Sequence, residues 1–278
     1  MELMTAGVDL TTLVLKLLLV PTFIGIVSLA GRRWGSTLSG WLIGLPLTSG
    51  PVAFFLALEQ GSLFASEASR GILMGIISVL VFCLVYSRLA IRFKLTPSIL
   101  GGVISYFVCT YLLDSVNPSL LLAFLSVIGF WLFSLVLMPK IGADRPRSGS
   151  ASAQWEIPLR MITATTLVLV ITGIAQILGP QLTGLLTPFP IYATILVIFT
   201  HRLEGGTEAV KLVKGLVAGL FTFTVFFLVV SSTILPWGIG LSFMSAIGIS
   251  LFTHAASLLV LKRADKESAL GYSLAPTA

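Results

Sequence analysis

Residues 120–138 read LLLAFLSVIGFWLFSLVLM, without one charged side chain. A helix crosses the hydrocarbon core of a bilayer with about 18 to 20 apolar residues, so this stretch is long enough to span it. The whole chain has the same character, because 56% of its 278 residues are hydrophobic and only 10% are charged. A soluble domain carries charge at about a quarter of its positions. Lipid offers the backbone no hydrogen-bond partner, and the alternating pattern of a barrel strand is absent, so we predict an all-α integral membrane protein.

The breaks between apolar runs predict about nine transmembrane helices. Charged residues, Gly, Pro and Asn mark these breaks. The helices are expected near residues 11–30, 37–58, 70–91, 97–113, 117–138, 158–178, 182–201, 209–231 and 238–261. Residues 231–261 also fit a half-helix followed by a span.

Basic residues gather in alternate loops, which predicts the orientation of the chain. These residues are Arg32 and Arg33, then Arg92 and Lys94, then Lys140, Arg145 and Arg147, then Arg202, Lys211 and Lys214, and finally Lys262, Arg263 and Lys266. By the positive-inside rule the N-terminus is outside and the C-terminus is cytoplasmic. Short loops and the lack of a sizeable soluble domain favour the cytoplasmic (inner) membrane of a bacterium.

The second half of the chain repeats the first at an offset of 144 residues. LSGWL at 38–42 aligns with LTGLL at 182–186, and the register continues without a gap, so that Pro46 falls on Pro190 and Gly61 on Gly205. Over positions 15–87, 17 of 73 aligned pairs are identical, about three times the number expected by chance, which indicates an internal repeat.

Each repeat would contain four spans, and the span at 117–138 would invert the second copy. We therefore expect two inverted four-helix repeats joined by a linker helix, a common design of secondary transporters. The expected domains are residues 1–113 for the first repeat, 114–138 for the linker helix, 139–156 for a flexible cytoplasmic loop, 157–263 for the second repeat and 264–278 for a cytoplasmic tail.

The second span of each repeat is rich in Gly and Pro. Proline removes a hydrogen bond from a helix, so both spans should be kinked or broken. Paired breaks in equivalent spans indicate a substrate site, although they can also do no more than shape kinked helices. The predicted substrate-binding residues are Gly40, Gly44, Pro46, Thr48, Ser49, Gly184, Thr187, Pro188, Pro190, Tyr192 and Thr194.

Three ionisable residues at membrane depth are candidates for gating or coupling. Lys16 and Arg160 occupy equivalent repeat positions, and either attract anions at opposite mouths or snorkel to the headgroups. His254 either relays protons or is a hydrogen-bonded structural residue. The pairs Gly71/Gly75 and Gly215/Gly219 are expected only to let helices pack closely.

These features favour a permease, a secondary transporter of a small anionic or zwitterionic solute, because broken helices present positive ends to such groups. The alternatives are a structural or accessory membrane subunit and a lipid flippase. We expect no enzymatic activity, cofactor or metal, since no phosphate loop, metal-ligand spacing or nucleophile elbow is present. The basic residues set orientation and do not predict nucleic-acid binding. The expected partners are the lipid bilayer and a solute, and a homo-oligomer is left open.

Overall fold

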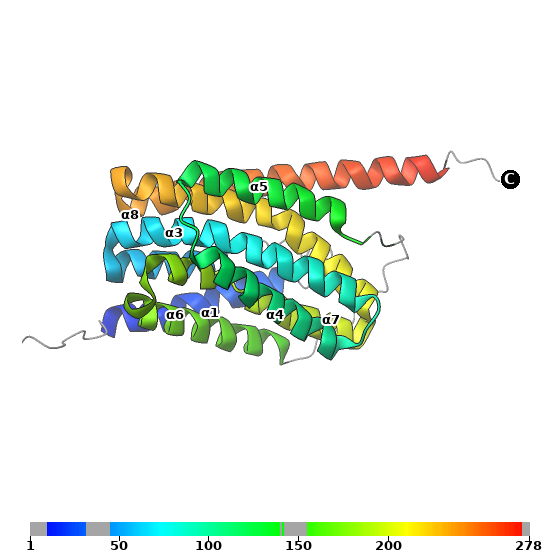
Figure 1. The fold of residues 1–278 in the computed structure, drawn as a ribbon, viewed down its shortest axis with the longest axis horizontal. Coiled ribbons are helices and arrows are strands. Elements are labelled where there is room, and N and C mark those ends of the chain that lie inside the picture. The colour runs from blue at the N-terminus through cyan, green and yellow to red at the C-terminus, as the bar shows by residue number, and fades with distance from the viewer. Residues whose placement is uncertain (1–9, 32–44, 140, 142–154, 274–278) are drawn as a thin grey trace, which may run out of the picture.

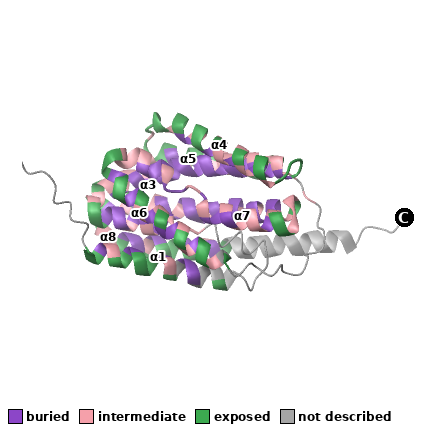
Figure 2. Cartoon of the chain, turned by 90° about the horizontal axis from the view of Figure 1, so that it is seen from below, coloured by how far each residue is buried: buried purple, intermediate pink, exposed green. Residues whose placement is uncertain are grey.

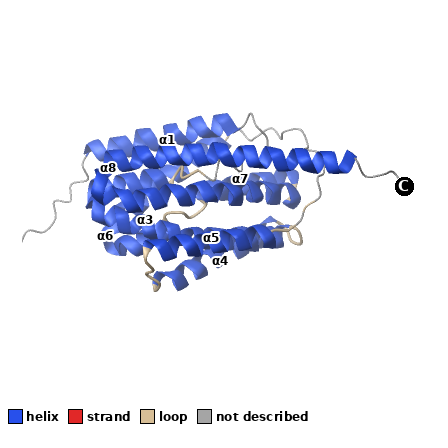
Figure 3. Cartoon of the chain, turned by 90° about the horizontal axis from the view of Figure 1, so that it is seen from above, coloured by secondary structure: helices blue, strands red, loops and turns tan. Residues whose placement is uncertain are grey.

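The computed structural model describes residues 10–31, 45–139, 141 and 155–273. Helices account for nearly all of these residues, and none of them lies in a strand (Figure 3). The helices are α1 (Leu10–Gly31), α3 (Ser49–Ala90), α4 (Leu95–Asp114), α5 (Leu120–Leu137), α6 (Glu156–Leu186), α7 (Ile191–Glu204) and α8 (Gly206–Ser273). The predicted sites Gly40 and Gly44, most of the expected loop at 139–156, and residues 274–278 lie outside the described part of the chain.

The outer surface of the bundle is apolar. Ile177, Val136 and Phe252 are each more than three-quarters exposed, at 86%, 82% and 76%. Within the described residues, five helices are long and apolar enough to cross a membrane, namely α3, α4, α5, α6 and α8. Apolar side chains at this density on an outer face are stable against hydrocarbon and not against water. The chain is therefore a helical membrane protein, as its composition predicts.

Three of these helices fold back on themselves at a glycine. Thr222 and His254 of α8 are hydrogen-bonded at 3.0 Å although a straight helix would place them far apart, so α8 reverses at Gly238, midway between them. In α6 the Thr183 hydroxyl reaches the Ala175 carbonyl across Gly179. Helix α3 reverses in the same way at Gly61. Ser49 and Val79 lie on opposite sides of Gly61 in the sequence and yet line one cavity, so the two halves of α3 lie side by side.

These reversals need glycine because the backbone enters the region of positive φ. The φ angles are +88° at Gly61 and +97° at Gly205, with ψ of 168° and 169°. A side chain in this conformation would clash with the backbone, which makes glycine the default residue. Gly61 and Gly205 are the two residues that the repeat alignment pairs, and the structure gives them the same backbone conformation.

The segments run along one common direction. In Figure 1, α1 begins at one end of the long axis and α8 finishes at the other, and the two halves of α8, yellow and orange-red, lie side by side. The first and last described helices therefore begin and end at opposite ends of the bundle.

Helix α3 is the centre of the bundle. Its second half is buried almost without interruption from Ala68 to Ser78, and Figure 2 shows it covered by other helices. It packs against α4, α5, α6 and α8. Hydrogen bonds tie it to α8, because Ser66 and Ser231 each donate to the other's backbone carbonyl, at 2.9 and 3.0 Å.

Gly71 and Gly75 let α3 touch the broken end of α6. A Cβ atom on Gly71 would lie 2.7 Å from the Gln181 carbonyl oxygen and 3.0 Å from the Gly184 Cα atom, and one on Gly75 would lie 2.5 Å from Pro188. The predicted packing role of this glycine pair is confirmed. Gly184, predicted to bind substrate, lies in this helix contact.

The expected linker span is α5, which docks on the rest of the bundle through Trp131. The indole Nε1 donates to the Val217 carbonyl at 2.7 Å, and the ring packs on Phe221. The helix begins at Leu120, where the Ser119 hydroxyl accepts a hydrogen bond from the Leu122 N–H.

The segment at 231–237 continues the first half of α8, so the second half is a separate run that starts after Gly238.

We predict that Gly71→Ala lowers the free energy of unfolding by about 1–3 kcal/mol, the usual cost of forcing atoms into a packed contact. Gly173→Ala in α6 is the matched control, because a Cβ there meets no atom within 4 Å. It should be neutral or stabilise by up to about 1 kcal/mol, since alanine is the better helix former. Thermal unfolding of the detergent-purified protein measures both. Equal effects of the two substitutions would contradict the close contact.

Candidate functional site

Residues 45–48, called the first break, are not helical and directly precede α3. Pro46 has no N–H to continue a helix, and α3 begins only at Ser49, with Thr48 at the N-cap. Within the break, Leu47 N–H donates to the Leu45 carbonyl at 2.7 Å, and Gly50 N–H to the Pro46 carbonyl at 2.9 Å. The Thr48 side chain makes no capping hydrogen bond. Its hydroxyl therefore does not satisfy the first N–H groups of α3.

The second break covers residues 187–190. Helix α6 ends at Leu186 and α7 begins at Ile191, with Pro190 at its N-cap. The Thr187 hydroxyl donates to the Thr183 carbonyl at 2.6 Å, and Ile191 N–H to the Phe189 carbonyl at 2.7 Å. The interruption predicted from the prolines of this span is present.

The two breaks meet. The Ser49 hydroxyl donates to the Thr187 carbonyl at 3.2 Å, which joins the start of α3 to the end of α6. Both breaks line one cavity of about 40 Å³. Of the predicted substrate-binding residues, this cavity brings together Thr48, Ser49, Pro188, Pro190 and Tyr192.

The other described candidates lie around this cavity and do not line it. Thr187 contributes its backbone carbonyl to the Ser49 bond, and Pro46 lines a larger neighbouring cavity. Thr194 lies one turn into α7, and its buried hydroxyl has no hydrogen-bond partner among the described residues. A buried hydroxyl without a partner is unusual and commonly marks the place of a water or a ligand.

Tyr106 of α4 supports the second break and was not found from the sequence. Its hydroxyl donates to the Leu185 carbonyl at 2.8 Å, and its ring packs edge-on against Phe189 at 5.0 Å between centroids. Leu185 is in the last turn of its helix, where carbonyls lose their intrahelical donors. The tyrosine therefore satisfies a backbone group that the break has freed.

A buried cation stands behind the cavity. Arg160 of α6 is only 4% exposed, and its Nη1 donates to the Tyr192 hydroxyl at 3.2 Å. Its guanidinium carbon lies 4.8 Å from the centre of the Tyr192 ring, a cation–π contact. Since Tyr192 lines the cavity, Arg160 is connected to it through one side chain.

Lys16, the equivalent residue of the first repeat, is held elsewhere. Its Nζ lies 2.6 Å from Glu59 Oε1 and donates to the Thr172 hydroxyl at 2.7 Å. Lys16 is 4% exposed, so its ammonium is enclosed by protein instead of reaching outward. The contacts join α1, α3 and α6. The position of Glu59 beside Lys16 follows from how the helices pack and not from the sequence pattern.

His254 is buried inside the α8 hairpin, 3.0 Å from the Thr222 hydroxyl, and it does not line either cavity. Its observed contact is the one expected of a hydrogen-bonded structural residue. The three ionisable candidates therefore occupy three separate places in the bundle.

Comparison with known proteins gives no relative. No family model, curated protein or solved structure matches this chain.

We predict that Lys16 and Glu59 are energetically coupled. Removal of one partner leaves a poorly solvated charge, whereas replacement of both removes the problem. Lys16→Met and Glu59→Gln should each destabilise the protein by more than about 1 kcal/mol, and the double variant by less than their sum. Unfolding midpoints of the four proteins give the coupling energy. Strictly additive effects would mean that the pair contributes nothing.

Proposed function

We propose that this chain is a permease, a secondary transporter that binds a small anionic or zwitterionic solute between its two helix breaks. The observation that carries this proposal is the meeting of residues 45–48 and 187–190 at one cavity. Two non-helical segments with aligned prolines, far apart in the sequence, and the helix starts that follow them supply hydroxyl groups to one small cavity. Unwound segments at membrane depth are tolerated where they line such a space.

The charge distribution favours a negatively charged group. Helices α3 and α7 both begin at this cavity, and the start of a helix carries a partial positive charge, although the Gly50 and Ile191 N–H groups are already bonded to the Pro46 and Phe189 carbonyls. The hydroxyls of Ser49 and Tyr192 add donors at this cavity, and the Tyr192 hydroxyl is held by a hydrogen bond from Arg160. A carboxylate is the simplest group that this set would hold.

The architecture that we propose is a chain of nine crossings in two inverted repeats of four. The matching conformations of Gly61 and Gly205, the breaks at Pro46 and Pro190, and the opposite positions of the two ends of the bundle support it. The basic loops favour an outside N-terminus and a cytoplasmic C-terminus. Rocking one repeat against the other would then open the cavity to each side in turn.

The described conformation corresponds in this proposal to a closed state. The Ser49–Thr187 hydrogen bond spans the site, and 40 Å³ leaves room for only a few waters. A solute would replace this bond with its own acceptor oxygens. The Lys16–Glu59 pair would hold α1 against α3 until the repeats move. His254 has no part in this proposal.

One observation favours a different function, lipid handling. A large apolar cavity opens beside the first break, as a flippase would need. The accessory-subunit alternative requires dry and fully paired breaks. We give precedence to solute transport, because the hydroxyls and helix ends at the smaller cavity suit a polar group.

We predict that small carboxylates raise the apparent melting temperature of the purified protein in a saturable manner, because a ligand of the folded state stabilises it. Ser49→Ala and Tyr192→Phe should each weaken the apparent affinity at least about fivefold, the effect of losing one hydrogen bond to a charged group. A thermal-shift titration with carboxylates, amino acids and neutral sugars measures this.

The matched control is Ser232→Ala, because the Ser232 hydroxyl bonds only to carbonyls of its own helix turn. It should leave the titration unchanged. The account fails if Ser49→Ala behaves like this control, or if no charged solute produces a shift.

A further inference from the structure

The cavity between the breaks is too small for a whole organic solute. Its 40 Å³ compares with roughly 10–15 Å³ for the smallest space that holds one water and with about 300–1,000 Å³ for pockets that hold small molecules. It fits a carboxylate-sized group. The rest of a solute bound there would have to occupy neighbouring space.

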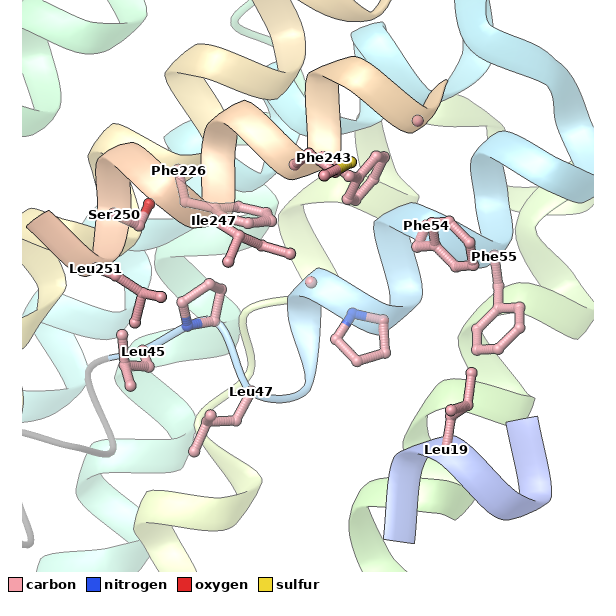
Figure 4. A pocket seen from close by; sticks show the side chains of 15 residues that line it. Leu19, Leu45, Leu47, Phe54, Phe55, Phe226, Phe243, Ile247, Ser250 and Leu251 are labelled. Atoms are coloured by element: carbon pink, nitrogen blue, oxygen red, sulfur yellow. The ribbon is translucent and has the colours of Figure 1, made fainter. Parts of the chain in front are cut away.

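Such space adjoins it. A second cavity of about 500 Å³ lies between α1, the first half of α3 and the second half of α8, and Leu45 and Leu47 line both cavities (Figure 4). Residues 45–48 therefore form a wall between the two cavities. The Pro46 ring lines the large cavity, whereas Thr48 and Ser49, which follow Leu47, line the small one.

The large cavity is apolar. Its walls include the rings of Phe54, Phe55, Phe226 and Phe243, and Ser250 carries the one polar side chain among the lining residues. Binding of a hydrocarbon group in such a cavity is favourable in proportion to the apolar area that is buried. A charged or hydroxylated group would lose its hydration there and find no hydrogen-bond partners in its place.

This cavity opens toward the bilayer. Met244 and Leu251 of α8 and Leu19 of α1 line it and are 72%, 56% and 51% exposed on the outer face of the bundle. That face also carries Leu241 and Phe252, which are 65% and 76% exposed. The opening therefore faces hydrocarbon, and an apolar chain would enter it without crossing water.

We infer that the solute is an amphipathic anion, whose carboxylate lies between the two helix breaks and whose linear apolar tail lies in the cavity between α1, α3 and α8. This inference rests on the proposed function and names its substrate class. The shared wall at Leu45 and Leu47 joins a polar head site to an apolar tail site. A short carboxylate would use only the first, and each methylene that enters the second adds affinity.

The test compares butanoate with octanoate on the full chain in phosphatidylcholine nanodiscs, with binding of the radiolabelled acids corrected for empty discs. Octanoate should bind at least tenfold more tightly, because each methylene removed from water contributes roughly a threefold to fourfold gain. Ile247→Trp, which fills the large cavity, should weaken octanoate binding at least tenfold and leave butanoate binding unchanged.

Ile249→Trp is the matched control, since Ile249 is a partly exposed isoleucine of the same helix that does not line the cavity. It should change neither affinity. Octanol, with the same tail and no charge, should bind at least tenfold more weakly than octanoate.

The contrary results separate the two claims. If butanoate and octanoate bind with equal affinity, or if Ile247→Trp changes neither affinity, the tail site is overturned and the head site is not affected. If octanol binds as tightly as octanoate and this binding is lost in Ile247→Trp, the large cavity holds apolar chains independently of the head site. That result would also overturn the inference. If neither butanoate nor octanoate binds, both the inference and the proposed function are overturned.

Discussion

A polypeptide backbone inside a membrane must satisfy its hydrogen bonds within the protein, and this constraint governs the two helix breaks. Unwinding at residues 45–48 and 187–190 frees N–H and C=O groups where no water is at hand. The structure supplies partners from other helices: the Ser49 hydroxyl for the Thr187 carbonyl and the Tyr106 hydroxyl for the Leu185 carbonyl. The breaks are therefore stable only against each other and against α4, which fixes where the candidate site lies.

Glycine makes that arrangement possible in two physical ways. At Gly61, Gly179 and Gly238 it lets a helix reverse within one residue, so that three long helices become antiparallel pairs. At Gly71 and Gly184 it removes the side chains that would hold α3 and α6 apart. Neither contribution is chemical, yet both bring residues of the two breaks to one cavity.

Much of this could be predicted from sequence, because composition and proline act locally. The apolar runs predict membrane helices, and the prolines predict non-helical segments: α3 begins only after Pro46, and α6 ends before Pro188 and Pro190. The repeat alignment pairs Gly61 with Gly205, and these two glycines share one backbone conformation. Side-chain partners across helices were not predictable: the Glu59–Lys16 pair and the support from Tyr106 depend on which helix faces which. Gly184 was assigned to the site for the same reason, since a packing glycine and a binding glycine look alike in sequence.

The central claim is that the two breaks form a site that opens to each side of the membrane. Its most direct measurement is the labelling of Ser49→Cys by a membrane-impermeant maleimide in oriented vesicles, with Cys83 and Cys109 replaced by alanine. Ser49 is 1% exposed in the described conformation, and Ser69, equally buried in the same helix away from both cavities, provides the control Ser69→Cys. The account predicts that Ser49→Cys reacts from both sides, is slowed by a bound carboxylate, and reacts far faster than Ser69→Cys. Equal and negligible labelling of the two cysteines would contradict it and leave the breaks as packed structural features.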